Sequence, residues 1–280
     1  MILSRRHIGT VAKKCFVPVR RLSSSTSLLE VERRDNGVCI VSLSSDPKKL
    51  NPMTASLADA VEDTMKELSI DESIRAVVLT GKGTAFSAGG DFQFLRDRTQ
   101  DNPHNNSKIM RAFYRKFLSI RNVPVPVISA LNGPAIGAGL CVALATDIRV
   151  THPTCKLGLT FVGLGLHPGM AATHFLPRLV GHQTAARLLL TGDIISGKEA
   201  CDLGLALSAE NPLEYAIELA GKMAKQAPEA VQMCVRSLRN VQDDHIDRAL
   251  WREADCQAHN YASSVAEGLD AIIGKRPPNW

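Results

Sequence analysis

Two glycine-rich segments place backbone amides where they could do chemistry. The first, AFSAGGD (85–91), follows the apolar run AVVLTG (76–81), and the second, NGPAIGAGL (132–140), follows the apolar run VPVISA (125–130). Where a strand gives way to a helix, several N–H groups lack partners and the local field is positive. Such groups bind anions or stabilise negative charge that develops during a reaction. The pair of segments predicts two amides that converge on one oxygen, an oxyanion hole, although a single glycine-rich turn is more often structural.

The motifs of phosphate binding and metal binding do not occur in the sequence. There is no G-x-x-x-x-G-K-[ST], and the spacing of Gly133, Gly137 and Gly139 does not match G-x-G-x-x-G. The eight His and seven Cys residues include no C-x-x-C and no other spacing typical of metal ligands. We therefore expect neither a nucleotide loop nor a metal.

The elements that would position these segments alternate between strands and helices in the first two-thirds of the chain. Apolar, β-rich runs predict strands at 38–43, 76–81, 123–130, 148–152, 156–160 and 205–210. Helical periodicity predicts helices at 54–68, 109–120, 140–145, 171–180, 184–190, 197–203, 213–226, 228–240, 244–262 and 264–273. Residues 97–107 predict a mobile surface loop, and Pro124 and Pro126 suit an edge strand or the start of a strand. This is an α/β layout with a helical tail.

The first 29 residues differ from the rest in charge. They hold six Lys and Arg residues, no acid and the stretch RRLSSSTS, a pattern typical of a mitochondrial transit peptide; a disordered basic tail is the alternative. We expect cleavage between Leu22 and Leu29 and a location in the mitochondrial matrix. The remaining chain holds 27 basic and 28 acidic residues, so its charge does not favour nucleic-acid binding. The sequence contains no run of about 18 apolar residues, so it predicts no membrane span.

Several long stretches resemble the crotonase (enoyl-CoA hydratase/isomerase) superfamily. These are AFSAGGD, NGPAIGAGLCVALATDIRV, KLGLTFVGLGLHPGMAATHFLPRLVG, LLLTGDIISGKEACDLGL and the final KRPPNW. The resemblance covers about residues 31–280. It implies a crotonase-like spiral of ββα turns at 30–200 after the transit peptide at 1–29, and a helical C-terminal extension at 201–280 for trimerisation. Trimers of this family commonly pair into hexamers. The implied ligand is an acyl-CoA thioester, with no separate cofactor because coenzyme A is part of the substrate.

Carried over by position, the resemblance assigns the two oxyanion-hole amides to Gly90 and Ala138. It places Lys49 and Leu50 along the pantetheine and phosphates of coenzyme A. The adenine- and acyl-binding stretch and the other expected substrate-binding positions are Phe86, Ala88, Asp91, Phe92, Cys141, Thr160 and Phe161. Asp91 could instead cap the turn that follows it.

The acid/base residues of this family have no counterpart here. The two glutamates of its hydratases fall by position on Cys141 and Phe161, and the acid of its isomerases falls on Gly169. Phe161 cannot transfer a proton, and the apolar neighbours of Cys141 predict a neutral buried thiol. His167 is a candidate for proton transfer near the acyl pocket, or else a loop histidine bonded to the backbone. We expect Asp147 to be structural.

Three hypotheses about function follow. The chain could be a hydratase or isomerase with relocated acid/base groups. It could need the oxyanion hole alone, as a decarboxylase of a malonyl-CoA-like thioester would, because loss of CO₂ itself generates the enolate. It could also bind acyl-CoA without turning it over.

Overall fold

Residues 28–280 form one six-stranded sheet and one three-stranded sheet. The computed structural model describes residues 28–280, so the expected transit peptide lies almost wholly outside the described residues. The larger sheet has the order β1-β2-β3-β4-β6-β9, and only the β1–β2 pair is antiparallel. Its strands are β1 (Leu29–Arg33), β2 (Val38–Leu43), β3 (Ala76–Gly81), β4 (Val127–Leu131), β6 (Ile148–Thr151) and β9 (Leu207–Ser208). The smaller sheet joins β5 (Ala135–Ile136), β7 (Lys156–Gly158) and β8 (Ile194–Ser196).

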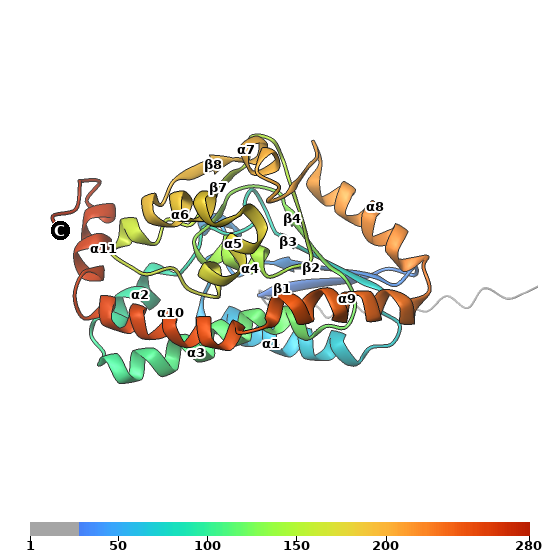
Figure 1. The fold of residues 1–280 in the computed structure, drawn as a ribbon, viewed down its shortest axis with the longest axis horizontal. Coiled ribbons are helices and arrows are strands. Elements are labelled where there is room, and N and C mark those ends of the chain that lie inside the picture. The colour runs from blue at the N-terminus through green and yellow to red at the C-terminus, as the bar shows by residue number, and fades with distance from the viewer. Residues whose placement is uncertain (1–27) are drawn as a thin grey trace, which may run out of the picture.

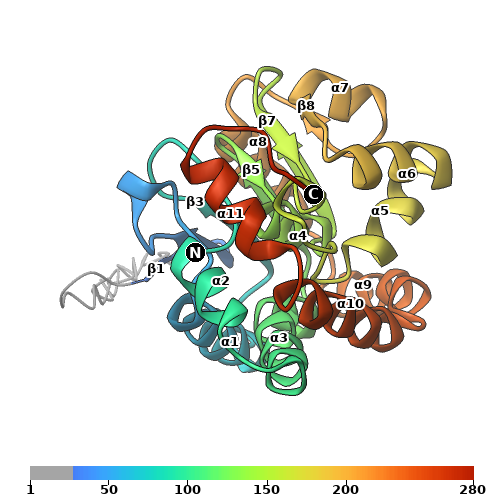
Figure 2. The same cartoon turned by 90° about the vertical axis from the view of Figure 1, so that its left-hand side faces the viewer.

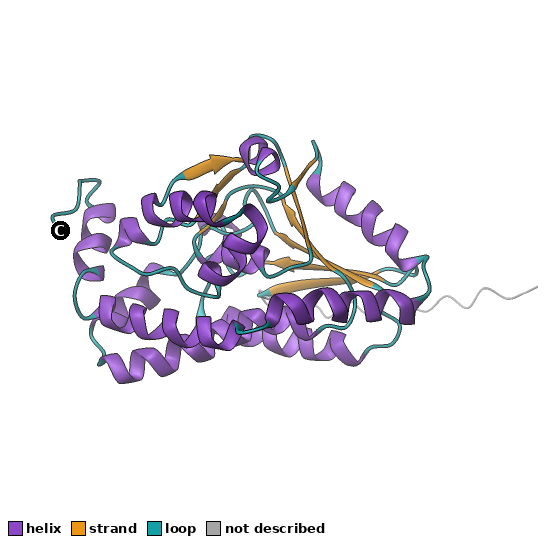
Figure 3. Cartoon of the chain, viewed as in Figure 1, coloured by secondary structure: helices purple, strands orange, loops and turns teal. Residues whose placement is uncertain are grey.

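Helices cover both faces of the larger sheet (Figures 1 and 3). They are α1 (Ala55–Ile70), α2 (Phe92–Thr99), α3 (Pro103–Leu118), α4 (Ala138–Leu144), α5 (Ala172–Val180), α6 (His182–Thr191), α7 (Gly197–Asp202), α8 (Pro212–Ala224), α9 (Pro228–Asp243), α10 (Ile246–Tyr261) and α11 (Val265–Ile273). The strands β2, β3 and β4 are buried almost throughout, as expected for parallel strands covered on both faces. The α/β layout is therefore confirmed.

Two apolar clusters lie on the two faces of this sheet. The larger one packs β2 and β3 side chains such as Val41 and Leu79 against the apolar faces of α1 and α3. The smaller one packs the opposite faces of the same strands, including Ile40 and Val78, against Ala216 of α8. The sheet thus continues beyond residue 200, because β9 pairs with β6 and α8 covers one face.

Two local expectations are wrong. Residues 97–107 form the end of α2 and the beginning of α3, rather than a mobile loop. Asn102 caps α3, with its side chain accepting from Asn105 N at 2.9 Å, and Pro103 occupies the first turn, where a proline is tolerated. The edge alternative for Pro124 and Pro126 is also wrong, because β4 lies between β3 and β6; the strand begins only after Pro126.

The last two helices, α10 and α11, pack against α3 and α2. Helix α10 runs alongside α3 in both views, and α11 lies beside α2 (Figures 1 and 2). These contacts bring side chains from residues near 110 and near 257 to one place, where they line a cavity.

Candidate active site

The two glycine-rich segments pair with each other through their main chains. Ser87 N donates to Pro134 O at 3.1 Å, and Ile136 N donates to Ser87 O at 3.0 Å. Gly89 has a φ of +101°, and a β-carbon there would lie only 2.8 Å from Ile136 O. A side chain at this position would therefore force the segments apart, so glycine is required for their contact. The β-carbon position of Gly89 also lies 3.7 Å from Ala138 N. The first helical amide of the second segment is therefore beside the first segment.

The amides of Gly90 and Ala138 have no acceptor within residues 28–280. Three amides next to them are paired, since Gly89 N donates to Ser87 Oγ, Asp91 N to Met53 O and Gly137 N to Gly158 O. The N–H groups of Gly90 and Ala138 make no such bond to a protein group, and both residues line the same cavity. Paired main-chain donors on the wall of a cavity suit an oxygen that gains negative charge.

The cavity has a volume of about 150 Å³ and a mostly apolar wall. It lies between the glycine-rich segments, α2, α3 and α10, with Ile272 of α11 also contributing. None of its lining residues, all within the described chain, is Lys, Arg, His, Asp or Glu. Its polar side chains are those of Tyr114, Thr160, Gln257 and Tyr261.

Half of the residues expected at the site line this cavity. They are Ala88, Gly90, Phe92, Ala138, Thr160 and Phe161. Phe92 is 46% exposed and Phe161 only 8%, so the cavity runs from an open end near α2 toward the interior. Leu50 and Lys49 lie outside it but adjoin the first segment, because Leu50 O accepts from Ala88 N at 2.8 Å.

Three further expected residues lie outside the cavity lining, in the structure that surrounds it. Phe86 is fully buried in the main core. Asp91 caps α2, and its carboxylate accepts from Phe94 N at 2.8 Å. Cys141 is fully buried on α4, and burial raises the pKa of its thiol well above the usual value, so the thiol is neutral.

His167 also lies outside the cavity lining. Its Nδ1 lies 2.6 Å from Pro168 O, its main-chain N–H donates to Asn260 Oδ1, and its carbonyl accepts from Gln257 Nε2 at 2.7 Å. Burial lowers the pKa of the imidazole, which favours its neutral form. These bonds fix the residue against the backbone beside the cavity.

Three buried polar residues near the cavity did not emerge from the sequence. Tyr114 of α3 and Gln257 of α10 line it, and Glu253 of α10 lies one turn before Gln257. The Glu253 carboxylate accepts hydrogen bonds from the main-chain N–H groups of Ala171 (2.7 Å) and Thr173 (3.0 Å). Burial raises the pKa of Glu253 to about 7. A signal did exist in the sequence, since 250, 253, 254 and 257 lie on one face of a helix together with apolar residues.

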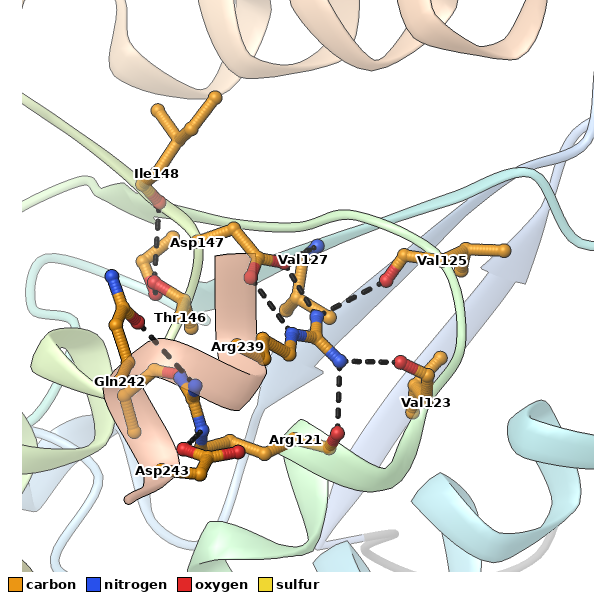
Figure 4. Close-up of polar contacts among 12 residues, drawn as sticks. Arg121, Val123, Val125, Val127, Thr146, Asp147, Ile148, Arg239, Gln242 and Asp243 are labelled. Atoms are coloured by element: carbon orange, nitrogen blue, oxygen red, sulfur yellow. Dashed lines mark hydrogen bonds and ion pairs between the residues drawn. The ribbon is translucent and has the colours of Figure 1, made fainter. Parts of the chain in front are cut away.

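Asp147 belongs to a separate, structural network (Figure 4). Its carboxylate accepts from Arg239 Nε at 2.8 Å and from Val127 N at 2.8 Å. Arg239 also donates to the main-chain oxygens of Arg121 and Val125. The network ties α9 to the start of β4, as expected for a structural acid.

Residues 28–280 lack two further features. No cluster of His, Cys, Asp or Glu there could hold a metal ion. None of the helices in that range combines the length and the apolar character that crossing a membrane requires.

Comparison with known proteins identifies one consistent group of relatives. The family model described as enoyl-CoA hydratase/isomerase matches residues 33–280. A Thermus thermophilus protein whose name assigns it to the enoyl-CoA hydratases is 33% identical over 257 residues, covering 90% of this chain and all of the relative. A crotonyl-CoA hydratase from Syntrophomonas wolfei is 30% identical, covering 84% of this chain and 91% of the relative. The crystal structure of an enoyl-CoA hydratase/isomerase from Pseudoalteromonas atlantica aligns with a TM-score of 0.81 at 27% identity, covering 91% of this chain and all of that one.

Proposed function

Because this chain belongs to the enoyl-CoA hydratase/isomerase family, the crotonase superfamily, we propose that it binds an acyl-CoA thioester with the carbonyl oxygen on Gly90 N and Ala138 N. One observation carries the proposal: two unpaired amides from adjoining segments stand on the wall of one apolar cavity. As the thioester becomes enolate-like, negative charge grows on this oxygen. Each preformed donor typically lowers the barrier by about 3–4 kcal/mol.

The acyl group would occupy the cavity and coenzyme A the surface beside it. Ala88, Phe92, Thr160 and Phe161 would contact the acyl part. Lys49 forms a surface ion pair with Asp46 at 3.6 Å and its side chain is 79% exposed, so it would exchange this partner for the phosphates; the main chain at Leu50 adjoins the first segment. Phe86 and Asp91 would contribute indirectly, through the position of the segment between them.

The reaction proposed for this site proceeds through an enolate without a carboxylate at the family's usual positions. Position 161 carries an aromatic ring on the cavity wall, position 141 a neutral thiol, and position 169 no side chain. A hydratase or isomerase reaction would therefore draw its proton from another group or from water.

A second candidate is decarboxylation of a malonyl-type thioester. In that reaction the bond to the carboxylate carbon breaks, its electron pair forms the enolate, and CO₂ leaves. The absence of charged side chains from the cavity lining favours it, because a carboxylate held there is desolvated and loses stability relative to neutral CO₂. A site that only binds acyl-CoA would show neither reaction.

Replacement of the Ala138 amide tests the proposal directly. Ala138 is the first residue of α4, where proline is tolerated, so Ala138→Pro removes the N–H with little cost to the helix. Ala138→Ser keeps the N–H and serves as the control. Binding of butyryl-CoA, loss of the enoyl chromophore of crotonyl-CoA and CO₂ release from methylmalonyl-CoA would be measured for all three proteins.

We expect Ala138→Pro to lower kcat/KM for whichever reaction occurs by about 10²–10³ relative to the serine variant. Equal activity in the two variants would contradict the role of this amide. Butyryl-CoA binding with neither reaction would reduce the function to acyl-CoA binding, and the absence of binding would overturn the proposal.

We also propose that the protein is a homo-oligomer, a trimer or hexamer, of the mitochondrial matrix. Exposed apolar side chains on the C-terminal helices support the first part, including Met233 and Val241 of α9 and Trp251 of α10. The acid-free, basic residues 1–29 support the second. Light scattering of the purified protein would test the assembly. Import of the chain with and without residues 1–29 into isolated mitochondria would test the location.

A further inference from the structure

Tyr114 presents an unpaired hydroxyl to the cavity. The residue lies on α3, its side chain is 1% exposed, and it lines the cavity. Its hydroxyl has no hydrogen-bond partner among the described residues. Buried polar groups are nearly always paired, so an unpaired one beside a cavity marks a point where a ligand atom or a water molecule would be bound.

Gln257 presents the complementary atom. It lies on α10, is 1% exposed and lines the same cavity. Its Nε2 donates to His167 O at 2.7 Å, which fixes the orientation of the amide and leaves Oε1 as a buried acceptor that no donor in residues 28–280 reaches. Between them, these two side chains offer one free donor, on Tyr114, and one free acceptor, on Gln257.

Gly169 brings these two groups together. A β-carbon on Gly169 would lie 2.6 Å from the Tyr114 hydroxyl and 2.9 Å from Gln257 Nε2. The two side chains therefore meet over the same glycine, whose missing side chain leaves them room. Both are more deeply buried than Phe92 at the open end, so they form the inner wall of the cavity.

The donor and acceptor together select the ligand group. Burial raises the pKa of Tyr114 well above the usual value, so its hydroxyl stays neutral and donates. A carbonyl on the ligand would satisfy Tyr114 but leave Gln257 Oε1 unpaired. A carboxylate would do the same and would add negative charge near Glu253, whose field already acts on Tyr114. A hydroxyl accepts from Tyr114 and donates to Gln257 Oε1, so it satisfies both.

We propose that Tyr114 and Gln257 are specificity-determining residues that bind a hydroxyl group carried at the far end of a short acyl chain. The inference rests on the proposed function, because it takes the acyl group of a CoA thioester as the occupant of the cavity. A dry cavity of this volume holds a ligand of about six carbon atoms, so the acyl chain is short. This hydroxyl belongs to the substrate and is distinct from any group that the reaction forms next to the thioester.

Calorimetric titration of the full chain with 4-hydroxybutyryl-CoA and with butyryl-CoA tests this assignment. We expect the hydroxylated thioester to bind about 10- to 100-fold more tightly, because the analogue without a hydroxyl leaves two buried polar atoms unpaired. Tyr114→Phe should bring the ratio of the two dissociation constants close to one. Tyr261→Phe is the matched control, since Tyr261 lines the same cavity but its hydroxyl already contacts Met110 Sδ at 3.7 Å, and it should retain the preference.

The outcomes separate this inference from the proposed function. Equal affinities in the unmodified protein would overturn the inference while leaving acyl-CoA binding intact, and would mean that water or a mutual contact satisfies Tyr114 and Gln257. A preference that Tyr114→Phe leaves unchanged would also overturn it. If neither thioester bound, the proposed function would fail and the inference with it. Should Tyr114→Phe not fold, Gln257→Met is expected to abolish the same preference.

Discussion

Glu253 of α10 stabilises a left-handed conformation of Ala171, which lies 82 positions earlier in the chain. Its Oε2 accepts the Ala171 N–H at 2.7 Å, and Ala171 has a φ of +59°. Met170, the preceding residue, also has a positive φ and lines the cavity. Non-glycine residues occupy this region only when their surroundings enforce it. The Glu253 carboxylate therefore shapes the cavity wall without being part of it.

This carboxylate should make stability depend on pH. The pKa of Glu253 is about 7 in the folded chain, against about 4.3 for an unfolded glutamate. The folded state therefore keeps its proton to higher pH than the unfolded state does. For this group, stability is greatest below about pH 4 and falls as pH rises through 7. Above pH 8, ionisation of Glu253 lowers the unfolding free energy by about 4 kcal/mol relative to its value below pH 4.

Urea unfolding of the wild type and of Glu253→Gln between pH 5 and pH 8 checks this expectation. The wild type should lose stability relative to the variant as the pH rises. The exposed Glu229→Gln on α9 controls for the other titrating groups. A difference between wild type and Glu253→Gln that stays constant across this range would show that Glu253 does not titrate there.

Substitution of Gly139 should separate the two glycine-rich segments. A β-carbon at Gly139 would lie 2.7 Å from Ser87 Cβ and 2.8 Å from Ser87 O, closer than van der Waals contact allows. We expect Gly139→Ala to lower the unfolding free energy by about 1–3 kcal/mol and to weaken butyryl-CoA binding. Gly163 has no atom within 4 Å of its β-carbon position, so Gly163→Ala should leave stability nearly unchanged. Similar thermal melts for the two variants would contradict the close contact.

The fold was predictable where the signals are local. Continuous apolar runs identified β2 and β3, and strand ends followed by small residues identified the two segments that carry Gly90 and Ala138. The prediction for residues 97–107 is wrong because a polar composition is typical of loops, whereas Asn102 and Pro103 begin a helix.

The inner wall of the cavity was not predictable in the same way. Tyr114 and Gln257 are brought together only by the packing of α10 along α3. The periodicity of a helix predicts which of its faces is buried, but not which other helix it packs against. The polar residues on the buried face of α10 could have indicated a site, but not its partner.

The Arg239–Asp147 pair should be essential for stability (Figure 4). Both side chains are largely buried, with exposures of 7% for Arg239 and 18% for Asp147. Arg239 also donates to the main-chain carbonyls of Val123 and Val125, just before β4. Arg239→Met would remove the only cation in residues 28–280 that is hydrogen-bonded to the Asp147 carboxylate, so we expect a loss of about 3–5 kcal/mol in urea unfolding. Lys198→Met breaks a fully exposed pair with Asp202 and should have little effect. A small loss for Arg239→Met would mean that water replaces the guanidinium.

A carboxylate at position 161 should give the cavity a proton-transfer group. Phe161 is 8% exposed, lines the cavity, and its Cζ lies 4.0 Å from the β-carbon position of Gly137, the residue before the Ala138 amide. A glutamate there would be partly desolvated, which raises its pKa toward the range useful for general acid/base catalysis. We expect Phe161→Glu to increase crotonyl-CoA hydration by at least about tenfold, within the 10²–10⁴ range of such groups. Phe161→Gln has a similar shape without the acid and should show no gain. If the wild type already hydrates crotonyl-CoA as fast as Phe161→Glu, or if the glutamine variant gains equally, the proton comes from a group other than residue 161.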